Sequence, residues 1–291
     1  MTIWNLGSIN ADYFYRVPHL PEPGETIAAA ALTRGLGGKG ANMSVAAARA
    51  AARVAHIGAV GPDGRWAVDR LTEYGVDTRW IREVSEPTGH AMIMVDDEGE
   101  NAIIIYPGAN RDIPESAVGL ALAEAHPGDF LLMQNETNKQ RFSAEIGSKL
   151  GLRIVYAAAP FSVAAVTAIL PHLDMLILNA VEMEQLHAAT GLVPGLQMGV
   201  NTVLVTRGAE GCVLFEARNG FAPVQFPAVK VDAVDTTGAG DTFTGYLLAG
   251  LDRGLPTEQA ISLATRAAAL MVTRRGTADV IPDLREVQDF G

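Results

Sequence analysis

The chain has 291 residues, of which 48% are hydrophobic and 19% are charged. This size can bury a large core, and it predicts one large domain or one domain with a smaller appendage. The net charge of -11 repels nucleic-acid phosphates, and no apolar run reaches the roughly 18 residues of a membrane span, so we expect neither a nucleic-acid partner nor a membrane partner.

Cysteine usage and the N-terminus bear on the cellular compartment. Cys212 is the only cysteine, which excludes an internal disulfide and suits a reducing environment. The N-terminal stretch MTIWNLGSINAD has no basic region followed by a long apolar one, so no export signal is visible. We therefore expect a cytoplasmic protein.

Short apolar runs alternate with helical patterns along most of the chain. Helices are predicted between the runs, at Asn42 to Ala52, Thr137 to Lys149 and Val181 to Thr190. The alternation indicates a layered α/β fold, which we take as a single domain over 1–291. The runs that predict buried parallel strands are 54–60, 130–134, 153–159, 175–179 and 202–206.

One region breaks this alternation. HAMIMV (90–95) and NAIIIY (101–106) flank the turn-rich DDEGE and predict a hairpin outside the parallel sheet. The segment before Gly35 can add a further strand to the same small sheet. We expect a β lid formed by approximately 11–37 and 88–107.

The stretch DTTGAGDTF (235–243) places glycines and an acid before the helix-competent TFTGYLLAGL. Such a helix start points free backbone amides at an anion, and the glycines allow close approach of a ligand. The structural alternative is a plain glycine turn in which Asp241 caps the helix.

A second glycine motif, RGLGGKGAN (34–42), contains G-x-G-x-x-G. A dinucleotide site would need a strand directly before this motif and an acid about 20 residues later, and neither is convincing here. Lys39 is followed by Gly40 and Ala41 rather than Ser or Thr, so the loop is not a Walker A motif either.

Four segments in order, GSINAD (7–12), PGET (23–26), GGKGAN (37–42) and DTTGAGDTF, together resemble the ribokinase (PfkB-type) family of sugar and nucleoside kinases, with the first and third pointing toward ribokinases. The resemblance covers nearly the whole chain. It implies a ribokinase-like three-layer α/β sandwich with a mainly parallel central sheet and a small β lid over the sugar. It also implies a homodimer through that lid.

The resemblance assigns roles to the residues of the motifs. Asp241 would be the catalytic base, and the amides of Gly238, Ala239 and Gly240 would form an anion hole for the transferred phosphate. Without the resemblance, Asp12 and Glu136 would be taken as solvated turn acids. We expect Asp12 to lie at the end of the first strand. The residues implied to bind the sugar, beside Asp241, are Asn10, Asp12, Gly38, Lys39, Asn42 and Glu136.

The resemblance also implies ATP, Mg²⁺ and a monovalent cation such as K⁺ as cofactors. Asn179 and Glu182 would help to place magnesium and phosphate through water, and Thr206 and Gly208 would approach the nucleotide. The cation would be held beside the anion hole by Asp235 and Thr237 and, through main-chain oxygens, by Met271, Arg274 and Gly276.

The chain departs from ribokinases at three places. Ala157 to Pro160 stands where relatives often have N-P-A-P, and the segment between Thr190 and Thr202 is short, where ribokinases usually fit another helix. Val280 falls where ribokinases often offer a serine hydroxyl to the cation, and we expect Asp279 to compensate.

The sequence therefore predicts an ATP-dependent kinase that phosphorylates a primary hydroxyl of a small sugar, with D-ribose as the first candidate. A nucleoside kinase of the same family is the alternative. A catalytically silent sugar or nucleotide sensor stays open, although the intact Asp241 and its glycines disfavour it. A Rossmann dehydrogenase is a third interpretation, disfavoured by the missing acid.

Overall fold

The computed structural model describes residues 1–290. Its centre is a nine-stranded sheet in the order β13-β12-β11-β10-β9-β8-β1-β4-β5. The pairs from β5 to β11 are parallel, and β12 and β13 add an antiparallel edge. The strands are β1 (Ile3–Leu6), β4 (Val54–Val60), β5 (Ile81–Glu83), β8 (Phe130–Gln134), β9 (Arg153–Ala157), β10 (Met175–Asn179), β11 (Thr202–Thr206), β12 (Cys212–Glu216) and β13 (Val224–Phe226).

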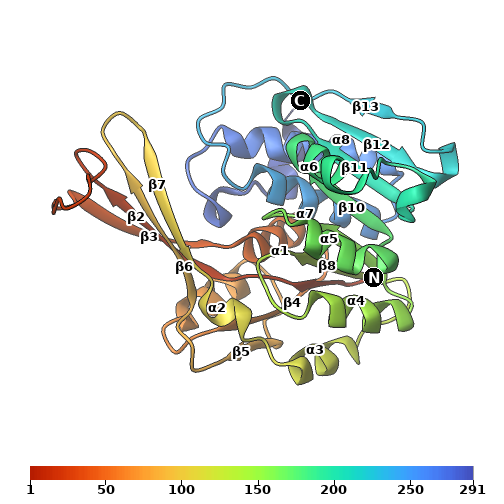
Figure 1. Cartoon of the computed structure of the whole chain (residues 1–291), viewed down its shortest axis with the longest axis horizontal. Helices are drawn as coiled ribbons and strands as arrows, with labels where there is room; N and C mark the ends of the chain where they lie inside the picture. The colour runs from red at the N-terminus through yellow and green to blue at the C-terminus, as the bar shows by residue number, and fades with distance from the viewer. Residues whose placement is uncertain (291) are drawn as a thin grey trace.

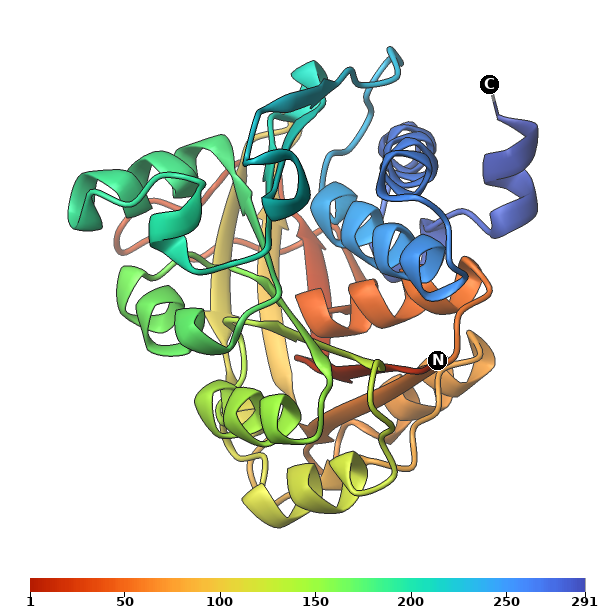
Figure 2. The same ribbon diagram turned by 90° about the vertical axis from the view of Figure 1, so that its right-hand side faces the viewer.

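Helices cover both faces of this sheet, as Figure 2 shows. Successive residues of a strand point to opposite faces, so Ile3 packs into one apolar core and Trp4 into the other. The first core lies under α1 (Lys39–Arg49), α2 (Arg65–Glu73), α7 (Ala239–Asp252), α8 (Thr257–Val272) and α9 (Leu284–Asp289). The second lies under α3 (Glu115–Leu122), α4 (Gln140–Lys149), α5 (Val163–Ile169) and α6 (Ala180–Thr190).

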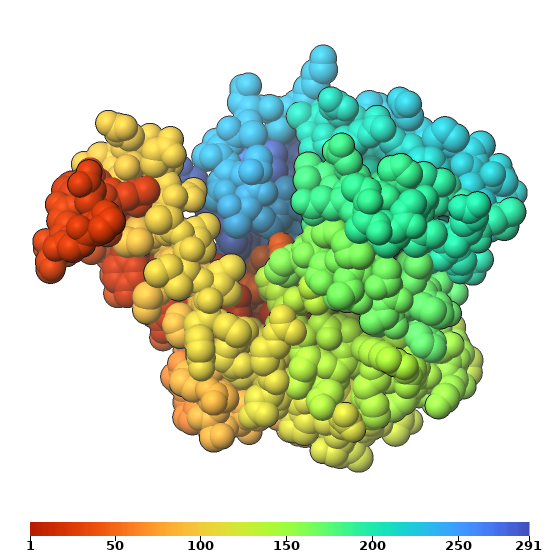
Figure 3. Space-filling view, viewed as in Figure 1, coloured from red at the N-terminus to blue at the C-terminus, as the bar shows by residue number. Residues whose placement is uncertain are grey.

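A second, four-stranded sheet has the order β3-β2-β6-β7 and is called the lid sheet below. It stands out from the body of the molecule in Figures 1 and 3. Little of the protein covers strand β7 of this sheet, since Ile103, Ile104 and Ile105 are each more than half exposed. Its strands are β2 (Asn10–Arg16), β3 (Ala31–Gly37), β6 (Gly89–Val95) and β7 (Asn101–Tyr106).

The predicted three-layer sandwich with a mainly parallel sheet and a small β lid is confirmed, and so is the hairpin of β6 and β7. Boundaries differ by a few residues. Helix α1 begins at Lys39 rather than Asn42, because Gly38 at a φ of 91° turns the chain into the helix directly after β3. Helix α4 begins at Gln140 rather than Thr137.

The short segment between α6 and β11 contains no further α-helix, only a single 3-10 turn. Among residues 1–290, no helix combines the length and apolarity needed to cross a membrane. The 3-10 turns of the fold are Gly108–Arg111, Leu170–His172, Leu196–Met198, Gly208–Glu210, Ala217–Asn219 and Ala278–Val280.

Candidate active site

The start of α7 is where the predicted anion hole lies. Gly238 adopts a left-handed φ of 76° before the helix, and a Cβ there would press against the Met271 side chain. The amides of Gly238, Gly240 and Asp241 have no acceptor among residues 1–290. The Ala239 amide differs, because it donates to the Thr236 carbonyl at 3.2 Å. Three free amides therefore remain at the positive end of the helix.

Asp241 lies in the first turn of α7 and is only 6% exposed. Asn42 in α1 donates from Nδ2 to Asp241 Oδ2 at 2.9 Å, and both side chains are buried. The hydrogen bond occupies one carboxylate oxygen and fixes the direction of the other. Asn42, which the resemblance assigned to the sugar, contacts the predicted base itself.

Lys39, the first residue of α1, lies among carboxylates. Its pKa is raised by Asp241 above all, and then by Glu136 and Glu182, while burial works in the opposite direction. The Lys39 backbone amide also donates to Glu136 Oε2 at 3.0 Å. Carboxylates of α7, the start of α6 and the segment after β8 thus all act electrostatically on one ammonium group.

Glu136 ties the GSINAD and GGKGAN segments together. Its Oε2 accepts from the Ser8 hydroxyl as well as from the Lys39 amide. Ser8 Oγ in turn accepts from the Gly40 amide at 3.1 Å. Glu136 therefore faces the GSINAD and GGKGAN segments at once, and it is not a solvated turn acid.

Asp12 is 7% exposed, and burial followed by the nearby charge of Glu136 raises its pKa to about 7. A Cβ on Gly37 of the neighbouring strand β3 would overlap its carboxyl group, so any side chain at position 37 would displace Asp12. The expectation that Asp12 ends the first strand is wrong. Strand β1 ends at Leu6, and Asp12 is the third residue of β2 in the lid sheet, because the chain changes sheets at residues 7–9.

Sequence reasoning missed one residue of this region, Asn110. Its Nδ2 donates to Asn10 Oδ1 at 2.7 Å, and its Oδ1 accepts from the Ile9 amide at 2.9 Å. It follows β7, about 100 residues from Asn10, and only the pairing of β2 with β6 brings the two together. The repeated G-A-N at 108–110 and 40–42 was the one available signal.

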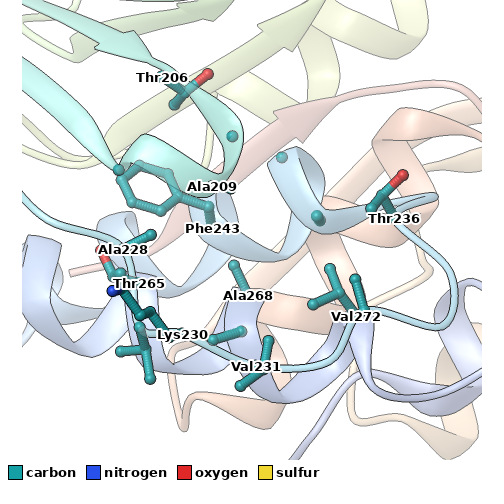
Figure 4. A pocket seen from close by; sticks show the side chains of 17 residues that line it. Thr206, Ala209, Ala228, Lys230, Val231, Thr236, Phe243, Thr265, Ala268 and Val272 are labelled. Carbon is teal, nitrogen blue, oxygen red and sulfur yellow. The ribbon is translucent and has the colours of Figure 1, made fainter.

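A cavity of about 630 Å³ opens on the other side of the α7 start (Figure 4). Thr206, the last residue of β11, and Gly208 line it, as do Ala239 and Gly240 at the start of α7. Most of its wall is apolar, and small residues of α8 leave room for a flat ring system. The remaining lining residues are Ala209, Gly211, Ala228, Val229, Lys230, Val231, Ala233, Thr236, Phe243, Thr265, Ala268, Ala269 and Val272.

Asn179 and Glu182 stand at the boundary of β10 and α6, where they form a capping box. Asn179 Oδ1 accepts from the Glu182 amide at 2.8 Å, and Glu182 Oε2 accepts from the Asn179 amide at 2.7 Å. Burial raises the pKa of Glu182, while Lys39 opposes this shift. Glu182 Oε1 has no partner among residues 1–290, so the cap leaves one carboxylate oxygen for a ligand.

Asp235 brings the two halves of the predicted cation loop together. Its Oδ1 accepts from the Thr237 amide at 2.9 Å and its Oδ2 from the Gly276 amide at 3.3 Å. Two of the three carbonyl oxygens predicted to bind the cation, those of Arg274 and Gly276, lie on this loop. The third, the Met271 carbonyl oxygen, accepts a hydrogen bond from the Arg274 amide at 2.9 Å.

The expectation that Asp279 compensates for Val280 is wrong. The Asp279 carboxylate pairs with Arg70 at 3.0 Å and accepts from the Tyr74 hydroxyl, and both partners belong to the α2 region. These contacts commit it to the surface, so the loop has no side-chain oxygen in place of the serine hydroxyl.

The sequence of residues 3–284 matches the pfkB family of carbohydrate kinases. The chain belongs to this family. It is 36% identical to the ribokinase of Haemophilus influenzae over 303 aligned positions that cover 99% of this chain and 98% of the relative.

Two solved structures extend the comparison for this pfkB family member. The ribokinase of Thermotoga maritima is 32% identical, with a TM-score of 0.88 and coverage of 100% of this chain and 99% of that one. The ribokinase of Arabidopsis thaliana, complexed with ribose and ATP, is 29% identical, with a TM-score of 0.87 and coverage of 99% and 97%. The family resemblance carried by the four motifs is thus confirmed over the full chain.

Proposed function

We propose that this pfkB family member is an ATP-dependent kinase that phosphorylates the primary hydroxyl of a small sugar, with D-ribose as the first substrate. The observation that carries the proposal is the place of Asp241. It lies at a helix start with free amides, between a polar cluster on one side and an apolar cavity on the other. The ribokinase relatives at 36% and 32% identity support the choice of sugar.

Asp241 supplies the base of the proposed reaction. The carboxylate oxygen that Asn42 does not contact takes the proton of the sugar hydroxyl. At the same time the oxygen of that hydroxyl forms a bond to the γ-phosphorus of ATP. The bond between the γ-phosphorus and the β,γ-bridging oxygen breaks, and ADP leaves. The free amides of Gly238 and Gly240 stabilise the negative charge on the transferred group, and the Lys39 ammonium adds a full charge nearby.

The polar cluster suits a polyol. Asn10, Asp12 and Glu136 offer amide and carboxylate groups around the backbone of Gly38 and Lys39. Charged acceptors make stronger hydrogen bonds to hydroxyls than neutral ones do. A small sugar can thus be held by several directional contacts on the Asp241 side of the anion hole.

The apolar cavity suits the base and ribose of ATP, with Thr206 and Gly208 at its rim and Gly240 at its inner end. Asn179 and Glu182 fit a magnesium ion, because Glu182 keeps one oxygen free and Mg²⁺ prefers few carboxylates and several waters. The ion would neutralise phosphate charge when bound.

We also propose that the loop of Asp235, Thr237, Arg274 and Gly276, with the Met271 carbonyl, holds a monovalent cation. Asp235 already joins both halves of the loop, which supports the proposal. Potassium should raise kcat above the value in sodium. Equal rates in potassium, sodium and a bulky organic cation contradict this assignment.

A homodimer through the lid sheet is the proposed assembly. Strand β7 pairs only with β6 in residues 1–290, and Ile103, Ile104 and Ile105 are exposed on it. An unpaired apolar edge of this kind favours association. Ile104→Lys should shift the sedimentation coefficient from dimer to monomer, with Leu120→Lys, at an exposed leucine on α3, as the control. A wild-type monomer refutes the assembly.

We propose a cytoplasmic location on the basis of Cys212. The thiol is buried, and burial raises its pKa to about 11, so it is an inert structural residue without a disulfide partner. Cell fractionation with compartment markers tests this location, and recovery in a secreted fraction contradicts it.

The decisive experiment for the function is a phosphoryl-transfer assay with ATP and magnesium. D-ribose, 2-deoxyribose, other pentoses, hexoses and nucleosides serve as acceptors. The proposal expects the highest kcat/KM with a pentose and a product phosphorylated on the primary hydroxyl, as phosphorus NMR can identify. A higher kcat/KM with a nucleoside would replace the sugar by the nucleoside alternative, and no turnover with any acceptor would refute the kinase.

A further inference from the structure

A series of hydrogen-bonded, buried polar side chains crosses the central sheet below the GSINAD and GGKGAN segments. Asn5 of β1, Ser44 of α1, His56 of β4 and Gln134 of β8 are each at most 1% exposed. Within residues 1–290, none of them lines the cavity, and their side chains make no hydrogen bond to Asn10, Asp12 or Glu136. Buried polar groups cost free energy unless they are hydrogen-bonded, so a polar series in the middle of an apolar core needs a physical explanation.

The hydrogen bonds of this series follow one direction. Gln134 Nε2 donates to Asn5 Oδ1 at 2.8 Å, and Asn5 Nδ2 donates to both the Gly40 carbonyl and Ser44 Oγ at 2.8 Å. Ser44 Oγ lies 2.8 Å from His56 Nδ1, and His56 Nε2 lies 3.1 Å from the Gly7 carbonyl. This series of hydrogen-bonded side chains thus ends on two backbone carbonyls, that of Gly7 in GSINAD and that of Gly40 in GGKGAN.

The Gly7 carbonyl decides the tautomer of His56. A carbonyl only accepts, so His56 Nε2 must carry the hydrogen, and in the neutral ring Nδ1 is then an acceptor. Ser44 must therefore donate to Nδ1, which it can do because Asn5 needs only one of its lone pairs. Burial lowers the pKa of His56 to about 4, which keeps the ring neutral near pH 7.

The two carbonyls lie where the sugar-side segments touch. Gly7 and Gly40 pack backbone against backbone, because a Cβ on either would overlap the other. The Ala41 amide donates to the Ser8 carbonyl at 2.8 Å across the same contact. Gly7 precedes Asn10 and Asp12, and Gly40 follows Lys39. Neither glycine has a side chain that could hold this contact, so it depends on the backbone and Ser8 hydrogen bonds across it and on the side-chain donors that reach the two glycine carbonyls.

We propose that His56 is a positioning residue for sugar phosphorylation: it holds the Gly7 carbonyl directly and the Gly40 carbonyl through Ser44 and Asn5, and so sets the spacing of Asp12 and Asn10 from Lys39. The inference rests on the proposed sugar kinase activity. An apolar residue at position 56 would fill the core without the cost of a buried polar group, but it would leave the Gly7 carbonyl without a donor.

Three substitutions at His56 separate the two ring nitrogens. In His56→Gln the side-chain amide reaches the place of Nε2 and can still donate to Gly7. In His56→Asn it reaches only the place of Nδ1, so the Ser44 contact is kept and the Gly7 contact is lost. His56→Phe loses both. His126→Gln, at an exposed histidine before β8, is the matched control.

The expected readout is a split between the two substrates. The sugar KM should rise by about 10-fold in His56→Asn and His56→Phe, since a buried carbonyl loses its partner, while the ATP KM should stay within about two-fold of wild type. His56→Gln should restore the sugar KM. Unchanged sugar KM with only a lower Tm overturns the positioning role, and so does an equal rise of both KM values.

A second measurement does not depend on turnover. Nitrogen NMR of the wild-type protein at pH 7 should show His56 with its hydrogen on Nε2, and Ser44→Ala should weaken hydrogen-exchange protection at residues 7–12 and 37–42. A hydrogen on Nδ1, or unchanged protection, overturns the proposal. If wild-type protein phosphorylates no sugar, the proposed function fails; wild-type turnover with insensitive His56 variants refutes only the inference.

Discussion

The two sides of Asp241 differ in polarity: one is lined by polar side chains and the other mostly by apolar ones. The proposed sugar side is a set of charged and amide side chains, Asn10, Asp12, Lys39 and Glu136, beside the touching backbones of Gly7 and Gly40. The proposed nucleotide side is a cavity of about 630 Å³ with a mostly apolar wall. In the proposed function, recognition of the sugar depends on directed hydrogen bonds and on protonation, whereas recognition of the nucleotide depends on the shape and volume of the cavity. Each side should therefore fail in its own way.

The largest effect should come from the residue that both sides share. Asp241→Asn keeps the size of the side chain and an oxygen that can accept from Asn42, but it removes the base. The value of kcat should therefore fall by roughly 10² to 10⁴. Sugar and nucleotide dissociation constants from calorimetry should change little. Asp69→Asn, at an exposed ion pair on α2, is the control. A variant with near wild-type turnover would remove Asp241 from the mechanism.

On the sugar side alone, Asp12→Ala should raise the sugar dissociation constant by roughly 10-fold to 10³-fold, because two charge-assisted hydrogen bonds are lost. The affinity for a non-hydrolysable ATP analogue should stay near wild type. The matched control is Asp97→Ala, at an exposed acid in the hairpin of the same lid sheet. Equal weakening of both ligands would mean that Asp12 only braces the sheet.

The sugar side should also respond to pH. The pKa of Asp12 is about 7 because of burial and the charge of Glu136, so lowering the pH through 7 neutralises the carboxylate. If the ionised form accepts the sugar hydroxyls, the sugar dissociation constant should rise by about 10-fold between pH 8 and pH 6, while nucleotide affinity changes less.

Folding stability should follow the opposite sign. A raised carboxyl pKa means that the folded protein favours the neutral form, so the contribution of Asp12 to the free energy of unfolding is present at low pH and is lost as pH rises from about 3.8 to about 7.

Asp12→Asn should flatten the pH dependence of sugar binding. A binding profile that keeps its slope in this variant would assign the titration to another group.

On the nucleotide side, a change of volume should act without any change of charge. Ala268→Leu, in the wall of the cavity, should raise the ATP KM by about 5-fold through crowding and leave the sugar dissociation constant unchanged. Ala268→Ser adds a small polar atom and serves as the control, with an effect within about two-fold. If the leucine variant loses sugar affinity instead, the two sides are not separate.

Much of the fold followed from the sequence for a simple reason. Buried parallel strands are short continuous apolar runs, so 54–60, 130–134, 175–179 and 202–206 were visible before any pairing was known. The break in this pattern at 90–106 likewise showed the lid hairpin. Sheet order and the place of β2 were not visible, because pairing joins residues far apart in the chain.

For the candidate site, the sequence by itself determined which residues were proposed for the chemistry, and the tertiary structure decided their contacts. Glycine motifs and their acids are local patterns, and they named Asp241, Asp12 and Lys39. Only the fold brought Asn42 to Asp241 and Asn110 to Asn10, and only the fold gave His56 its two partners. A hydrogen bond between residues 100 or 199 positions apart depends on strand order and helix packing, which no local pattern contains.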